Sequence, residues 1–271
     1  MSVRRIELTS STSVSKHDPS VDAPNILLLT ATITPPPGVI SLARSDPSVR
    51  LDDYANALRF YLSLVGQCVD YIVFSDNSNS DVSSLKAMVD QAKVTELVEF
   101  IVFEGLDYPP VWGRGYGEFK LVEHMMTHSK IINRHPESTV WKITGRYIVK
   151  NLCRLIARKP SNFDIYCNYR NVPRRWTDTC LIAWTPNGYQ AGLKNIYQEL
   201  KEPNRVTNME TLFRKLLEQR SEFIKVIPRF KVTPLLKGVR GWNNSDYSRV
   251  RDLLKYYLRC SANRLMPWWW I

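Results

Sequence analysis

The stretch Asn25-Ile-Leu-Leu-Leu-Thr-Ala-Thr-Ile33, followed directly by Pro35-Pro-Pro-Gly38, sets the pattern for the first half of the chain. A short apolar run that ends at prolines and a glycine is typical of a buried strand leading into a loop. Similar runs follow at residues 70–75, 97–103 and 138–144, and helical spacing of apolar residues separates them at 51–64, 82–92 and 117–129. This alternation predicts an α/β domain with a mainly parallel central sheet.

The basic charge of the chain is concentrated near its end. Among 271 residues, 37 Lys and Arg oppose 26 Asp and Glu, for a net charge of +11. Residues 213–271 hold 13 of the cations and 4 of the acids. Such a region attracts nucleic acid, anionic lipid or phosphorylated substrates, although it can also be a solvated face that only aids solubility.

Three regions follow from composition. Residues 1–23 are rich in Ser, Thr and Asp and are expected to be a flexible leader, 24–212 form the α/β unit, and 213–271 form a helical basic region. No run approaches the roughly 20 apolar residues of a membrane span. Five cysteines without a C-x-x-C pair argue against a disulfide scaffold and suit a reducing cytosol.

In open α/β sheets, ligands bind outside the carboxyl ends of the strands. The candidate ligand-binding residues predicted at or just after those ends are Thr30, Ala31, Thr32, Ser75, Asp76, Asn77, Gly145 and Arg146. Lys142 and Arg146 place two cations near one strand end, where they suit a diphosphate. Alternatively, Lys142 extends from a sheet edge and Arg146 caps a turn.

Two further segments carry candidate chemistry. In residues 112–118, glycines at 113, 115 and 117 precede a helical pattern. These glycines suit a loop whose backbone contacts an anion, and they suit a loop without a ligand equally well. Glu210 and Asp178 are candidate general bases, although Glu210 also suits the first turn of a helix and Asp178 also suits an ion pair with a neighbouring arginine.

Metal binding is not indicated. The chain has no Asp-x-Asp, and His124 and His128 lack both the intervening Glu of a zinc-protease motif and an obvious third ligand.

Residues 113–118 (GRGYGE), followed by 142–147 (KITGRY) with Asn151 just beyond, resemble a pattern of GT-A-type glycosyltransferases from bacterial capsule and O-antigen loci, which use nucleotide sugars. The resemblance covers roughly residues 24–213. It implies a cytoplasmic hexosyltransferase of surface polysaccharide biosynthesis, moving a sugar from a nucleotide diphosphate sugar to a lipid-linked or glycan acceptor.

The resemblance also implies roles for the residues. Residues 30–34 and 75–77 would hold the nucleotide, Lys142 and Arg146 would face the diphosphate, and Tyr116 and Glu118 would line the sugar side. Glu210 or Asp178 would deprotonate the acceptor. The family commonly uses Asp-x-Asp with a divalent metal. Here fixed cations would replace that metal, so no metal or other cofactor is predicted.

The C-terminal segment predicts a surface anchor. Residues 252–258 have amphipathic helical spacing among basic residues, and Trp268-Trp-Trp270 follows, a combination that favours the interface of an anionic membrane. The tryptophans could instead pack on the domain or on a partner subunit.

Two other functions stay open, a nucleic-acid-binding protein and a non-catalytic interaction protein. The absence of a helix-turn-helix, zinc-finger or RNP motif leads us to expect no nucleic acid partner.

Overall fold

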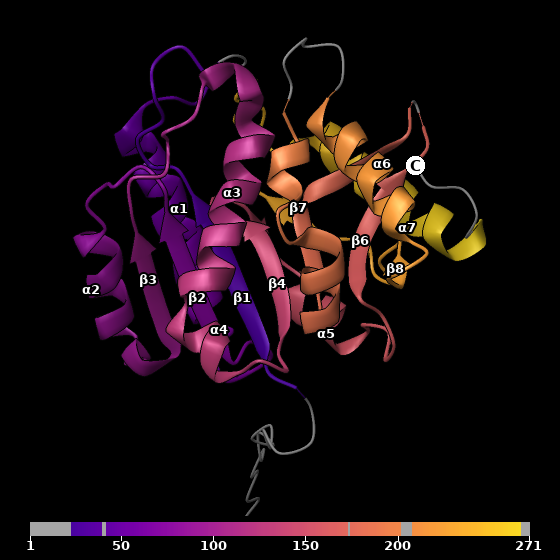
Figure 1. Ribbon diagram of the computed structural model, residues 1–271, viewed down its shortest axis with the longest axis horizontal. Helices are drawn as coiled ribbons and strands as arrows, with labels where there is room; N and C mark the ends of the chain where they lie inside the picture. The colour runs from indigo at the N-terminus through magenta and orange to yellow at the C-terminus, as the bar shows by residue number, and fades with distance from the viewer. Residues whose placement is uncertain (1–22, 40–41, 173, 202–207, 267–271) are drawn as a thin grey trace, which may run out of the picture.

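A seven-stranded sheet lies at the centre of the computed structural model, which describes residues 23–39, 42–172, 174–201 and 208–266 (Figure 1). The strand order is β3-β2-β1-β4-β7-β6-β8. The strands are β1 (Asn25–Ala31), β2 (Tyr71–Asp76), β3 (Val98–Val102), β4 (Thr139–Thr144), β6 (Ile165–Arg170), β7 (Trp176–Trp184) and β8 (Val226–Ile227). β1 to β4 are parallel, and β7 is antiparallel to both β4 and β6. The predicted α/β domain with a mainly parallel sheet is confirmed.

Helices cover both faces of this sheet (Figure 1). They are α1 (Pro47–Leu62), α2 (Ser83–Gln91), α3 (Gly113–His128), α4 (Lys130–Arg134), α5 (Leu152–Ala157), α6 (Met209–Arg220) and α7 (Val250–Leu265). Single helical turns lie at η1 (Thr95–Leu97), η2 (Pro110–Trp112), η3 (Gly188–Leu193) and η4 (Ile196–Glu199).

Strand β1 is buried along its whole length because strands flank both its edges and helices cover both its faces. Leu27 packs in one core with Tyr54 of α1, and Leu28 packs in the other with Phe119 of α3. A strand buried on both faces needs a near-continuous apolar sequence. This is why the sequence alone predicts a buried strand at residues 25–31.

Two helices begin earlier than predicted. The Asp46 side chain caps α1 by accepting hydrogen bonds from the backbone N–H groups of Ser48 and Val49. Helix α3 begins at Gly113, within the expected glycine loop.

The glycines of α3 serve packing. A Cβ at Gly115 would lie 1.9 Å from Cγ of Met209, and one at Gly117 would lie 1.8 Å from the Tyr108 hydroxyl. Only a residue without a side chain permits this approach. Gly115 and Gly117 also line the cleft described below, so close packing and the predicted ligand contact are compatible at these two positions.

Cys68 and Cys153 form a disulfide, with their Cα atoms 5.3 Å apart. The two cysteines lie 85 residues apart in the sequence and share no motif, so their spacing did not predict this pairing.

The C-terminal region joins the sheet. β8 pairs with β6, and β9 (Leu236–Lys237) pairs with β5 (Ile148–Val149) in a separate two-stranded sheet. In the described part of the chain, no helix has the length and apolar character needed to cross a bilayer. Most of the expected leader, at 1–22, and the tryptophans at 268–270 lie outside the described residues.

Candidate functional site

A cleft with a volume of about 940 Å³ lies at the carboxyl edge of β1 and β4. The antiparallel strands also contribute to this edge, since β6 ends there and β7 begins there. The first turns of α3 and α6, together with α7, add to the wall. The sequence-predicted residues that line the cleft are Thr30, Ala31, Thr32, Glu118, Arg146, Asp178 and Glu210.

Glu118 and Lys142 form a charged pair at the base of the cleft. Lys142 is fully buried on the central strand β4, and its Nζ donates to Oε1 of Glu118, to Thr144 Oγ1 at 3.3 Å and to the Thr179 carbonyl at 2.7 Å. These three acceptors use all three N–H donors of the ammonium group. Lys142 does not line the cleft, so the expectation that it faces a diphosphate is corrected: it contacts Glu118 instead.

The Glu118 carboxylate is held at one oxygen. Thr30 and Thr144 also donate to Oε1, at 3.2 and 2.8 Å. Burial favours the neutral acid, but the charge of Lys142 and these hydrogen bonds outweigh that effect and lower the pKa of Glu118. No contact to Oε2 is found among the described residues, so Glu118 offers an ionised oxygen to a ligand in the cleft.

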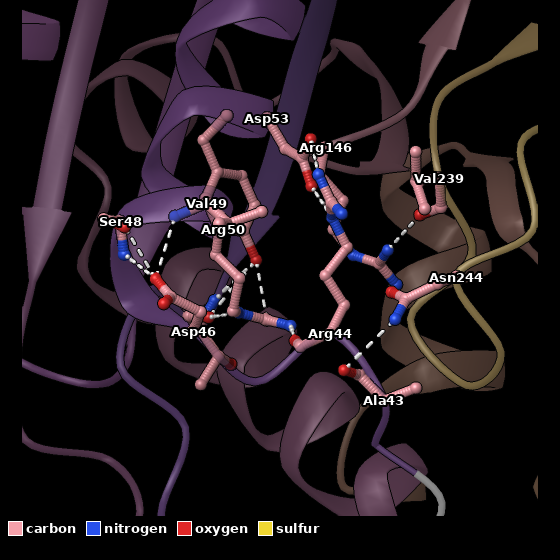
Figure 2. Close-up of polar contacts among 12 residues, drawn as sticks. Ala43, Arg44, Asp46, Ser48, Val49, Arg50, Asp53, Arg146, Val239 and Asn244 are labelled. Carbon is pink, nitrogen blue, oxygen red and sulfur yellow. Dashed lines mark hydrogen bonds and ion pairs between the residues drawn. The ribbon is translucent and has the colours of Figure 1, made fainter.

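Arg146 lies at the rim, beside the loop that follows β9. Its guanidinium lies 4.6 Å from the ring centroid of Tyr147 and donates to the Val239 carbonyl at 2.5 Å (Figure 2). The same loop is tied to the segment before α1, where Gly241 accepts from the backbone N–H of Ala43 at 2.8 Å. Arg146 is thus held in one orientation while still lining the cleft.

Two carboxylates stand on the other side of the cleft. Asp178, on β7, lies 3.6 Å from Nη2 of Arg170 and accepts from the Cys180 thiol at 3.2 Å. Glu210, in the first turn of α6, donates its backbone N–H to Asn208. Both line the cleft, so the structure leaves both as candidate bases.

The predicted residues at the carboxyl end of β2 support a neighbouring loop. Asp76 accepts from the backbone N–H of Ile33 and from Ser78, while Asn77 accepts from the Thr32 hydroxyl. Ser75 donates to the Ile101 carbonyl. None of Ser75, Asp76 and Asn77 lines the cleft, contrary to the expectation of direct nucleotide contact.

Tyr116 and Gly145 are also packing residues. The Tyr116 ring lies against Tyr108, Trp112 and Tyr197. A Cβ at Gly145 would lie 2.9 Å from the Thr30 carbonyl, so the glycine lets β4 turn close to β1. Neither residue lines the cleft, so the expectation that they contact the donor is corrected.

Several cleft residues were not predicted from the sequence. They are dispersed arginines and their neighbours: Arg50, Arg114, Arg170, Arg174, Trp176, Arg240, Asp252 and Arg259. Arg50 maintains the loop after β1, since it donates to the Thr32 carbonyl. The excess of basic residues in 213–271 was a signal for Arg240 and Arg259. It could not show which basic side chains of that region line the cleft.

The residues at the end of β4 do not suit a divalent metal. Thr144 and Arg146 stand at that strand end, and the nearby Glu118 carboxylate already binds an ammonium group. Within the ranges that the structure covers, no group of three His, Cys, Asp or Glu side chains is placed to hold a metal ion. His124 and His128 stack on each other with ring centroids 4.0 Å apart.

No protein-family model matches the sequence, and no curated protein is similar to it. Solved structures give distant similarities. A protein of Desulfovibrio desulfuricans G20 assigned as a nucleotide-diphospho-sugar transferase is 10% identical, with a TM-score of 0.46, over 90% of this chain and 96% of its own. The inositol-1-phosphate CTP transferase of T. maritima is 14% identical, with a TM-score of 0.41, over 86% and 95%.

A 4-diphosphocytidyl-2C-methyl-D-erythritol synthase is 10% identical, with a TM-score of 0.41, over 88% of this chain and 99% of its own. At these identities and TM-scores, the similarities assign neither an activity nor a substrate to this chain.

Proposed function

We propose that this protein is a GT-A-like glycosyltransferase that moves a hexose from a nucleotide diphosphate sugar to a lipid-linked or glycan acceptor in surface polysaccharide biosynthesis. One observation carries the proposal. Glu118 and Arg146 line the same cleft at the carboxyl edge of a mainly parallel sheet, where α/β proteins bind ligands. A fixed carboxylate suits sugar hydroxyls, and a fixed guanidinium suits a diphosphate.

The residues have separate roles in the proposed reaction. The acceptor oxygen bonds to the anomeric carbon, the bond from that carbon to the phosphate oxygen breaks, and the nucleoside diphosphate leaves with the bonding electrons. Asp178 or Glu210 takes the acceptor proton. Arg146 stabilises the charge that develops on the leaving diphosphate. Lys142 acts as a positioning residue because it contacts Glu118 rather than the cleft.

We expect calorimetry with uridine, guanosine, thymidine and cytidine diphosphate sugars to identify one or two donors. Since no carboxylate cluster in the described part of the chain suits a metal, binding and transfer should persist in a chelator. In this proposal the donor nucleotide lies beside Ala31 and Thr32, which line the cleft at the end of β1. Failure of all four nucleotide classes to bind would contradict the proposal. Complete loss of activity in a chelator, restored by manganese or magnesium, would contradict its metal independence.

We also propose that α7 holds the protein on an anionic membrane surface, where a lipid-linked acceptor would lie. Leu254, Tyr257 and Leu258 are 58%, 65% and 64% exposed, and the exposed cations Arg251 and Lys255 lie on the same helix. Apolar side chains can enter the lipid interface, while each nearby cation contributes about 1 kcal/mol at an anionic leaflet.

Replacing both Leu254 and Leu258 with glutamate should lower sedimentation with phosphatidylserine vesicles about tenfold or more, because two leucines would no longer enter the interface. High salt should weaken binding of the unaltered chain. Phe223→Glu is the matched control, since Phe223 is 77% exposed but lies outside α7. If the unaltered chain ignores these vesicles at low salt, α7 is not a membrane anchor.

A further inference from the structure

An arginine–carboxylate pair joins α7 to the loop that follows β9. Asp252, in the first turn of α7, accepts from Nη2 of Arg240 at 2.6 Å, and both residues line the cleft. The guanidinium of Arg240 also donates to the Ser245 hydroxyl at 3.3 Å and lies 4.1 Å from the ring centroid of Tyr247. Because the pair is held in place by these contacts, little ordering is needed before it can bind a ligand.

The Asp252 carboxylate has one engaged oxygen and one without a partner. Oδ1 accepts from Arg240, whereas Oδ2 is buried and makes no hydrogen bond among the described residues. Burial favours the neutral acid, but the hydrogen bond and the charge of Arg240 outweigh that effect and lower the pKa of Asp252. A buried, ionised oxygen without a donor is costly, so it favours a ligand that brings an O–H or N–H group.

The charges around the pair favour a neutral ligand over a cationic one. Arg240 already neutralises the Asp252 carboxylate, and Arg251 and Lys255 stand beside Asp252 on the same helix. A ligand ammonium group would therefore meet other cations, whereas a hydroxyl adds no charge. Adjacent hydroxyls of a saccharide can donate to a carboxylate oxygen and accept from a guanidinium N–H at the same time.

The loop that carries Arg240 also brings an aromatic side chain to the cleft. Trp242 lines the cleft two residues after Arg240 and is 57% exposed. Gly241, between them, lies against Arg146, since a Cβ at this glycine would be 2.6 Å from Nη2 of that arginine. An exposed indole offers an apolar face on which the C–H groups of a sugar ring can pack. The pair and the indole therefore adjoin the residue proposed to face the diphosphate.

We propose that Arg240, Trp242 and Asp252 form a saccharide subsite. Asp252 and Arg240 bind ring hydroxyls, and the indole of Trp242 packs on the sugar ring. The assignment rests on the proposed function, which brings a donor sugar and an acceptor into this cleft. Because Glu118 is the proposed contact of the donor sugar, the expected occupant is a saccharide unit of the acceptor.

Saturation-transfer NMR on the full chain, with methyl glycosides of glucose, galactose, mannose and N-acetylglucosamine, tests the subsite. We expect at least one of these glycosides to bind. Asp252→Asn should weaken that binding by about tenfold or more, because a charged hydrogen-bonding partner is lost. Trp242→Ala should weaken it too, and its exposed position leaves the core intact.

Glu199→Gln is the matched control. It removes the carboxylate of another arginine pair, that of Glu199 with Arg220, and neither of these residues lines the cleft. This variant should bind the glycosides as the unaltered chain does. Thermal unfolding of each variant checks the fold, and Trp242→Ala decides the matter if Asp252→Asn does not fold.

Calorimetry with each nucleotide sugar of the donor panel, and with its nucleoside diphosphate, distinguishes the two sugars of the reaction. Weaker glycoside binding in Asp252→Asn, with both nucleotide affinities unchanged, would assign the acceptor sugar; weaker binding of the nucleotide sugar alone would assign the donor sugar. Unchanged saccharide affinity in both Asp252→Asn and Trp242→Ala, or no saccharide binding by the unaltered chain, would overturn the subsite. Glycoside binding that depends on Asp252, without binding of any nucleotide sugar, would instead overturn the proposed function alone.

Discussion

Glu118→Gln is expected to lower the free energy of unfolding by about 3–5 kcal/mol, because it leaves a buried ammonium group without its counter-charge. Lys142 is fully buried on the central strand β4, so water cannot replace the carboxylate. Its remaining acceptors, Thr144 Oγ1 and the Thr179 carbonyl, are neutral. Denaturant unfolding at neutral pH, monitored by tryptophan fluorescence, measures the change.

The reverse deletion is expected to cost less. In Lys142→Met the carboxylate of Glu118 stays in the cleft, where its side chain is 21% exposed and water can reach it. The double variant Glu118→Gln/Lys142→Met should recover much of the loss, since it buries no unpaired charge. Glu96→Gln, at an exposed position, is the control and should stay within about 0.5 kcal/mol of the unaltered chain. A loss below about 1 kcal/mol for Glu118→Gln would contradict the buried pair.

Acid titration gives a second readout of the same pair. The folded state lowers the pKa of Glu118 below its ordinary value of 4.5. Its contribution is therefore present above the unfolded-state pKa and is lost as the pH falls through the folded one. As the pH falls below about 4.5, the unaltered chain should lose stability more steeply than Glu118→Gln.

Arg146→Gln is expected to reduce transfer by on the order of 10² to 10³, because it removes a fixed cation from the leaving diphosphate. The effect should fall mainly on kcat, since the charge develops in the transition state. Arg146 is preorganised by its contact with Val239 and by the ring of Tyr147. Steady-state kinetics with the donor found by calorimetry measures the loss.

Two variants separate this role from a structural one. Arg146→Lys keeps a charge but loses the planar fork, so its activity should be intermediate. Arg158→Gln removes a charge from an exposed position after α5 and should leave transfer unchanged. Full activity of Arg146→Gln with an unchanged melting temperature would assign Arg146 to the turn and the loop after β9.

The strands and the edge where ligands should bind could be predicted from the sequence. Residues 25–31 are apolar because both faces of β1 are covered, and this leaves a continuous signal in one short segment. The prolines and glycine after β1 and the Gly145 turn after β4 likewise mark strand ends locally. The order of strands and helices then suffices to place the first four strands in a mainly parallel sheet.

Only the tertiary structure decided which charged residues share a site. Glu118 and Lys142 were each recognised, but their pairing depends on how α3 crosses the carboxyl edge of β4, and it turns Lys142 away from the cleft. The close approach of Gly115 to Met209 and of Gly117 to Tyr108 also could not be read from the glycine pattern. The Cys68–Cys153 disulfide joins segments far apart in the chain. Local sequence patterns report burial and turns, whereas charge pairing and close approach between distant segments arise only once the chain has packed.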